Sequence, residues 1–236
     1  MSSFDDKAVN RLALDSMALW KGCILASCVH GVMLAEYPFT LSENAWFGEI
    51  YMVRNDEGSK AALVFSEERE LLMGMFDDRK SPRSRLVLSS QYVRSHYKEA
   101  PEDIQDAAQA LSLLFEEKAG EKKLPFVTTG FWEEEDQILS RDNYEDWLAH
   151  GGHILTAQMM PFEEAMSYFK AKCSMDDARM EIAARIYQER IKSPKEKVIL
   201  KKEEIQVLED TGPYNIQACR QVFGQFGVVF EGETEI

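Results

Sequence analysis

The stretch 46–76, WFGEIYMVRNDEGSKAALVFSEERELLMGMF, decides the fold that we predict. It holds three apolar runs separated by the turn-like clusters NDEG and SEER, the runs being 46–53, 60–65 and 70–76. Short apolar runs between turn-forming clusters are typical of consecutive antiparallel strands. Apolar residues of 46–53 fall on both sides of the strand, which predicts cover on both faces of the sheet. The alternative is an aromatic face left open for a ligand or partner.

Helical periodicity lies on either side of this region. Residues 15–36 carry apolar side chains at helical spacing, and Pro101 is typical of the first turn of a second helix that ends at Gly120. Shorter helices are expected at 143–150 with Asp142 as N-cap, from Pro161 onward, at 174–192 and at 213–223, and further strands at 125–132, 154–160 and 227–230. Residues 195–210 fit either a helix or a strand.

These elements define an α+β fold. We predict an antiparallel sheet of about five strands with packed helices, followed by a helical C-terminal portion. The composition shifts near Cys173, from sheet signals to helical, lysine-rich sequence. We therefore expect a main α+β domain at 1–172 and a mostly helical portion at 173–236, which is either separate or part of the same domain.

Acidic residues outnumber basic ones, with 41 Asp and Glu against 27 Lys and Arg, so the formal net charge is -14. A charge of this sign repels nucleic acid and anionic membrane surfaces and attracts basic proteins. We expect a basic protein partner, no nucleic acid and no membrane. The alternative is that the charge only keeps the protein soluble.

Residues 22–35, GCILASCVHGVMLA, are the stretch that most resembles a membrane or targeting segment. The stretch is too short to span a bilayer, which needs about 20 apolar residues, and no signal-peptide cleavage pattern follows it. We predict a buried core helix here. The four cysteines form no CxxC pair, which favours a reduced compartment and a cytoplasmic protein.

Familiar catalytic and cofactor motifs are missing from the sequence. Cys28 and His30 lie two positions apart, which on a helix separates their side chains, and neither a GxSxG elbow nor a glycine-rich phosphate loop occurs. His150 and His153 lack further metal ligands nearby, so we expect no metal and no cofactor. The basic stretch RKSPRSR, residues 79–85, is expected to be an exposed loop, with binding of an isolated phosphate as the alternative.

The acidic stretch 133–146 is the candidate site. Seven acids and one arginine give it a local charge of -6, and it begins next to an aromatic pair. The residues that we expect to bind a partner are Trp132, Glu133, Glu134, Glu135, Asp136, Asp142, Glu145 and Asp146. An exposed aromatic group framed by carboxylates suits an interface with a cationic protein. The alternatives are a solvated connection and a pair of carboxylates for acid and base catalysis.

The sequence therefore favours a non-enzymatic, cytosolic protein-binding module that engages a basic partner through an acidic, aromatic-edged surface. One version is an immunity or antagonist protein whose carboxylates replace phosphates in a toxin's cleft. The competing interpretation is a hydrolase or small-molecule binder that uses paired carboxylates near Trp132, with Glu134 or Asp136 as a candidate. A third is an assembly protein, and a homo-oligomer is compatible with the aromatic faces of the meander.

Overall fold

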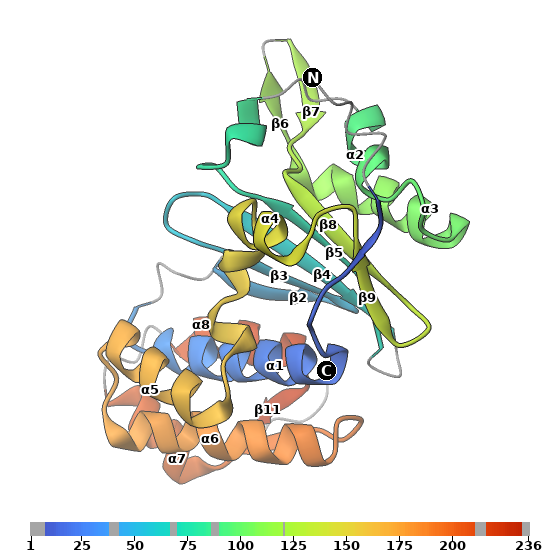
Figure 1. Cartoon of the computed structure of the whole chain (residues 1–236). Coiled ribbons are helices and arrows are strands. Elements are labelled where there is room, and N and C mark those ends of the chain that lie inside the picture. Colours follow the sequence, from blue (N-terminus) through green and yellow to red (C-terminus); the bar gives the residue numbers. More distant parts are fainter. Residues whose placement is uncertain are drawn as a thin grey trace. The chain divides into compact units, whose positions relative to one another are not determined.

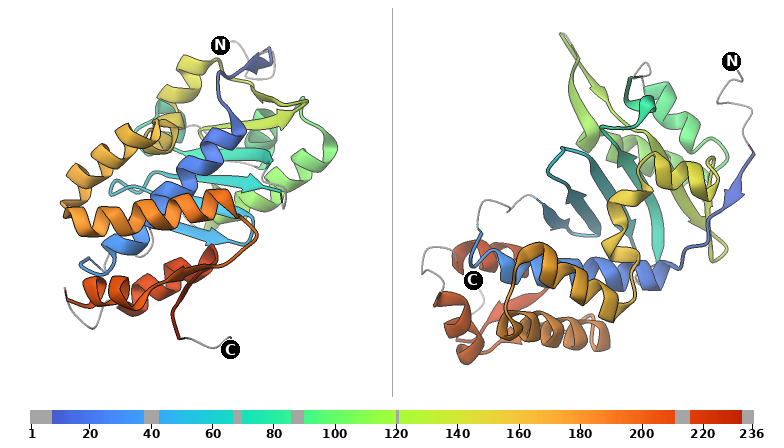
Figure 2. Two further views of the ribbon diagram at one scale, coloured as in Figure 1. Left: turned by 90° about the horizontal axis from the view of Figure 1, so that it is seen from below. Right: turned by 60° about the vertical axis from the view of Figure 1, so that its left-hand side comes forward.

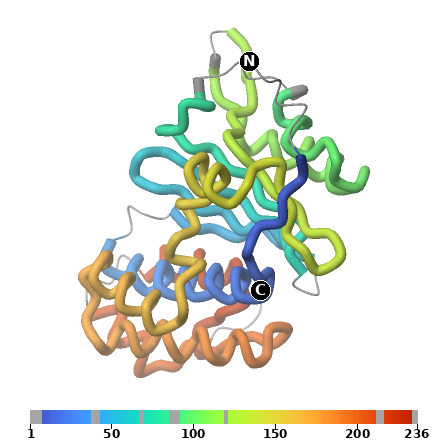
Figure 3. Tube along the Cα trace, viewed as in Figure 1, coloured from blue at the N-terminus to red at the C-terminus, as the bar shows by residue number. Residues whose placement is uncertain are grey.

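A seven-stranded antiparallel sheet is the largest element of the computed structural model (Figure 1). The structure describes residues 8–37, 43–66, 70–85, 90–119, 121–210 and 216–232 (Figure 3). The strand order is β1-β9-β8-β5-β4-β3-β2. These strands are β1 (Asn10–Arg11), β2 (Asn44–Phe47), β3 (Ile50–Arg54), β4 (Lys60–Phe65), β5 (Leu71–Asp77), β8 (Thr129–Glu134) and β9 (Gln137–Ser140).

The α+β class and the meander are confirmed, and two details are corrected. The sheet has seven strands in the described ranges, not about five. The run 46–53 is a hairpin of β2 and β3 and not one strand, because the chain turns at Gly48, whose φ of 63° suits glycine. The expected turn at 66–69 lies partly outside the described residues.

The chain forms two compact units that are interleaved in sequence. Unit 1 comprises Met1–Met17 and Met52–Thr156, and unit 2 comprises Ala18–Tyr51 and Ala157–Ile236. The boundary expected near Cys173 falls within unit 2, and as a statement about separate domains it stays a prediction.

Helices cover both faces of the sheet in unit 1. Gly130 and Phe131 are neighbours on β8, so their side-chain positions point to opposite faces. On one face lies Tyr97, the residue after α2 (Ser90–His96), and its hydroxyl fills the space that a Cβ at Gly130 would occupy. The same hydroxyl donates to the Gly74 carbonyl at 2.7 Å. On the other face Phe131 lies 6.0 Å, between ring centroids, from Trp147 of α4 (Tyr144–Ala149). The expected cover on both faces is confirmed for this part of the sheet, whereas Phe47 of β2, in the run from which it was predicted, is 58% exposed.

Several elements of unit 1 differ from the sequence prediction. The helix expected from Pro101 to Gly120 is α3 (Glu102–Leu111) with a 3-10 turn, Ser112–Phe115, and the chain then forms the hairpin of β6 (Glu116–Ala119) and β7 (Lys122–Pro125). The N-cap of α4 is Asn143 and not Asp142, since the Asn143 side chain accepts from the Asp146 N–H. The strand expected at 154–160 is wrong, because two 3-10 helices, Gly152–Leu155 and Ala157–Met159, occupy that region.

Unit 2 is mainly helical. Its helices are α1 (Ser16–Met33), of which Ala18 onward belongs to this unit, α5 (Phe162–Cys173), α6 (Asp177–Lys192), α7 (Lys202–Glu209) and α8 (Ile216–Gln225). Figure 2 shows α5 and α6 joined by a short turn. The rings of Phe162 on α5 and Tyr187 on α6 stack with their centroids 5.1 Å apart. The ambiguous residues 195–210 contain both β10 (Val198–Leu200) and α7, and β10 pairs in parallel with β11 (Val228–Phe230).

The apolar helix α1 is a core element of unit 2, as expected. Its central residues Cys23, Ile24 and Cys28 are at most 2% exposed. By length and hydropathy α1 also meets the criteria of a membrane-spanning helix, a test that core helices of soluble proteins pass as well. The cytoplasmic location therefore stays a prediction.

Candidate functional site

The turn between β8 and β9 places four consecutive acids at one hairpin end, and we call Glu133, Glu134, Glu135 and Asp136 the acidic tip. The two turn residues have positive φ, 51° at Glu135 and 60° at Asp136. A two-residue hairpin turn with both central φ angles positive normally carries Asn-Gly or Asp-Gly, because other side chains meet steric strain there. The chain thus keeps two carboxylates at positions where the backbone prefers other residues.

Three carboxylates of the acidic tip face solvent. Glu134, Glu135 and Asp136 are exposed, and in the described part of the chain none of the three forms an ion pair. A cationic partner would therefore not have to displace a Lys or Arg side chain of the described residues from these carboxylates. These three carboxylates are therefore accessible to a partner, as we expected for the candidate site.

Glu133 is partly buried and is electrostatically the most perturbed member of the tip. Burial raises the pKa of its carboxyl, and the neighbouring charges of Asp136 and Glu70 raise it further. Hydrogen bonds from Ser16 and from the Leu71 backbone lower this pKa. The raised pKa therefore reflects first the partial burial of the Glu133 carboxyl and only then the neighbouring negative charges.

Trp132 does not provide the exposed aromatic edge that the sequence suggested. It is 0% exposed, and its Nε1 donates to Glu134 at 3.3 Å. Trp132 faces the side of the sheet opposite to Phe131, where it contributes to the core of unit 1. The tip is therefore acidic without an aromatic frame.

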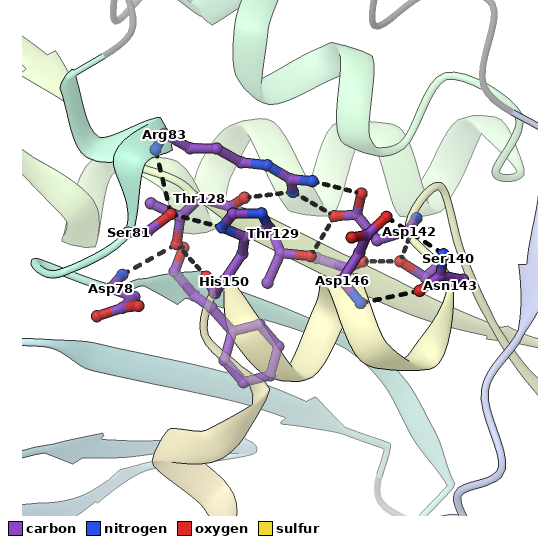
Figure 4. A network of polar contacts seen from close by, with 12 residues as sticks. Asp78, Ser81, Arg83, Thr128, Thr129, Ser140, Asp142, Asn143, Asp146 and His150 are labelled. Atoms are coloured by element: carbon purple, nitrogen blue, oxygen red, sulfur yellow. Dashed lines mark hydrogen bonds and ion pairs between the residues drawn. The ribbon is translucent and has the colours of Figure 1, made fainter.

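Asp142 is buried at the far end of the same strand pair. Its carboxylate accepts from Arg83 at 2.5 and 2.9 Å and from the Thr129 hydroxyl at 2.7 Å (Figure 4). Thr129 begins β8 and Glu134 ends it, so about five residues at 3.3 Å, roughly 17 Å, separate this ion pair from the tip. The structure does not bring Asp142 and the tip together.

Glu145 and Asp146 lie in the first turn of α4, apart from the tip. Glu145 is exposed, and Asp146 accepts from the Asn143 side chain at 3.2 Å. Acidic residues at this position interact favourably with the positive end of the helix dipole. Their place is explained by the helix start, and a role in binding stays a prediction.

A polar network connects the basic loop to the end of α4 (Figure 4). The Ser81 hydroxyl lies 2.7 Å from Nδ1 of His150. Thr128 accepts from the Asp78 N–H at 2.9 Å and donates to the His150 carbonyl at 2.6 Å, so one hydroxyl holds both segments. Arg83 adds a bond to the Thr128 carbonyl at 3.0 Å.

The stretch 79–85 is not the fully exposed loop that we expected. Residues 82–85 form a 3-10 helix, Pro82–Arg85, and Ser81 is 3% exposed. Its cations have acidic partners: Arg79 pairs with Asp77 and Glu117, Lys80 with Glu57, and Arg83 with Asp142. Pairing of these three cations weakens the case for a phosphate site there.

Asp77 and Lys60 carry shifted pKa values beside this loop. Burial raises the pKa of the Asp77 carboxyl to about 6, against the lowering effects of Arg79 and Lys60. Burial also lowers the pKa of the Lys60 ammonium. Arg79 lies 3.2 Å from the Asp77 carboxylate, and both Lys60 and Arg79 also reach Glu117. Two cations and two carboxylates thus share a partly desolvated cluster.

The cysteines are not activated. Cys23, Cys28 and Cys219 are buried, and burial raises the pKa of each thiol, to about 12 for Cys219. A raised thiol pKa removes the thiolate that nucleophilic chemistry needs. Among the described residues, no group of three His, Cys, Asp or Glu side chains is placed to hold a metal ion.

No protein-family model matches the chain, and comparisons with curated proteins and with solved structures give no match either.

Sequence reasoning missed the two polar pairs of the network. Arg83 and Asp142 are 59 positions apart, and Ser81 and His150 are 69 positions apart. The sequence analysis noted these residues separately: Ser81 and Arg83 lie in the basic stretch, Asp142 in the acidic stretch, and His150 in the pair with His153. No local spacing relates them, because the sheet brings them together.

Proposed function

We propose that the chain is a protein-binding module that engages a basic protein through the acidic tip. The observation that carries this proposal is the exposed set Glu134, Glu135 and Asp136, which forms no ion pair within the described ranges. Carboxylates arranged in this way steer a cationic partner and set its orientation more than they add affinity.

The shape of the tip supports this use. The turn residues Glu135 and Asp136 project from a hairpin whose strands are in register, with Glu134 paired to Gln137 and Glu133 to Ile138. A hairpin of this kind presents its charges on a short, ordered element, so little conformational entropy is lost on binding. An immunity or antagonist protein is one concrete form of this function, with the tip acting where a toxin would bind phosphates.

Charge neutralisation at the tip tests the proposal. The variant Glu134→Gln, Glu135→Gln, Asp136→Asn removes three charges, and the matched control Glu102→Gln, Asp103→Asn, Asp106→Asn removes three exposed charges from α3. Titration calorimetry with oligolysine at low and high salt measures the affinity of each. We expect the tip variant to lose about tenfold in affinity at low salt and most of the salt dependence, and the control to lose much less.

Equal weakening in the two variants would show that only the net charge attracts cations, and the proposal would be abandoned. Thermal unfolding of both variants checks that the fold is intact.

The hydrolase interpretation has less support at the tip. Trp132 is 0% exposed, so it supplies no aromatic surface beside the tip carboxylates on which a substrate could bind. The candidate acids Glu134 and Asp136 are both exposed, whereas catalytic carboxylates need burial or close pairing. Paired-carboxylate catalysis stays a prediction without a geometric argument in its favour.

A further inference from the structure

The hydrogen bonds around Ser81 fix the direction of its bond to His150. The Ser81 hydroxyl oxygen already accepts from the Arg83 N–H at 3.2 Å. Its own hydrogen needs an acceptor, because Ser81 is 3% exposed and a buried hydroxyl rarely stays unpaired. Among the described residues, His150 Nδ1 at 2.7 Å is the acceptor within reach. Ser81 therefore donates, and Nδ1 of His150 carries no proton.

The same residues hold the pair in position. Thr128 fixes the His150 carbonyl and the Asp78 N–H through one hydroxyl group, which joins the segment before Ser81 to the end of α4. The buried ion pair of Arg83 and Asp142 anchors the other side of the loop. His150 itself is half-buried, so part of the residue meets solvent. A serine that donates to an unprotonated imidazole on a fixed framework is the arrangement of a nucleophile and its base.

We propose that Ser81 and His150 form a nucleophile and base pair that hydrolyses small carboxylic esters, an activity independent of the acidic tip. The Ser81 oxygen attacks the ester carbonyl carbon while His150 Nδ1 takes the hydroxyl proton. The ester C–O bond breaks, and His150 returns the proton to the departing alcohol. Water then attacks the acyl-serine with the same base, which releases the carboxylic acid and restores the serine, so no oxidant or cofactor is consumed.

Acetyl transfer from p-nitrophenyl acetate to the full chain tests this proposal. Release of p-nitrophenolate measures the rate, and peptide mass spectrometry locates the acetyl group, which separates Ser81 from acetylated lysines. We expect an acetyl group on Ser81 in the wild type and none there in Ser81→Ala. His150→Gln keeps an acceptor for the serine but cannot take its proton, so we expect acetylation about 100-fold slower.

Ser84→Ala is the matched control, because the Ser84 hydroxyl donates to the Ser81 carbonyl at 2.7 Å in the same loop without reaching His150. It should acetylate at the wild-type rate. A wild type that carries no acetyl group at Ser81, or a His150→Gln variant as fast as Ser84→Ala, would overturn the proposal and leave the pair a structural bridge. If Ser81→Ala does not fold, the comparison of His150→Gln with Ser84→Ala still decides. Oligolysine binding reports separately on the tip.

Discussion

At the scale of single residues, burial separates carboxylates that look alike in the sequence. Asp142 is 1% exposed and is held by Arg83 and Thr129, whereas Glu145, three positions later, is exposed. Removing one partner of a buried ion pair leaves the other charge without compensation, which costs far more than losing an exposed charge. The two acids should therefore respond very differently to the same change.

Asp142→Asn is expected to lower the free energy of unfolding by about 3 kcal/mol, because Arg83 then remains buried without its carboxylate. Glu145→Gln, the matched control, should change it by less than about 0.5 kcal/mol. Urea unfolding at neutral pH measures both. Equal and small losses would mean that Arg83 is readily hydrated, which the burial of the pair argues against.

At the scale of elements, the β8–β9 hairpin keeps a turn sequence that its backbone disfavours. Glu135 and Asp136 hold φ angles of 51° and 60°, a region that Asn and Gly occupy at lower cost. The strain is local, since the flanking strands pair in register. Stability at this turn is therefore open to improvement, at the expense of two of the charges that we assign to binding.

Glu135→Asn with Asp136→Gly is expected to stabilise the protein by about 1 kcal/mol through the relief of this strain. The control Glu135→Gln with Asp136→Gln removes the same charges without favouring positive φ. Thermal unfolding compares the two. If both pairs raise the melting temperature equally, relief of charge repulsion is the cause and not the backbone.

Elements with strong local signals were predictable from sequence, and those set by distant contacts were not. The helical spacing of apolar residues in α1 and the apolar run of β4 predicted those elements correctly. Residues 154–160 read as a strand because they are apolar, yet two 3-10 helices bury Leu155 and Gln158 there. The acidic tip was recognised, but the burial of Trp132 depends on strand pairing with β5 and β9, which no local pattern encodes.

At the scale of the whole molecule, the free energy of unfolding depends on pH through carboxyl groups whose pKa differs between the folded and the unfolded state. Asp77 is the clearest case, because burial raises its pKa to about 6 although Arg79 and Lys60 are close. The folded state then binds a proton more tightly than the unfolded state. The contribution of Asp77 to the free energy of unfolding is therefore complete below the ordinary carboxyl pKa of about 4 and is lost as the pH rises through about 6.

The unfolding free energy of the wild type should therefore fall relative to that of Asp77→Asn as the pH rises from 4 to 8, by about 3 kcal/mol at most. Urea unfolding of both proteins across this range measures the difference. The exposed Asp103→Asn variant should run parallel to the wild type. If the unfolding free energy of the wild type instead rises relative to that of Asp77→Asn with increasing pH, the ion pair with Arg79 outweighs the effect of burial on the Asp77 carboxyl.

The interleaving of the two units has a consequence for biosynthesis. Unit 1 has all of its residues once Thr156 has left the ribosome, whereas Ala18–Tyr51 of unit 2 must wait for the segment from Ala157 onward. During that delay the apolar α1 lacks the helices that cover it, and exposed apolar segments of nascent chains are what chaperones bind. We therefore expect early folding of the first unit and chaperone dependence of the second.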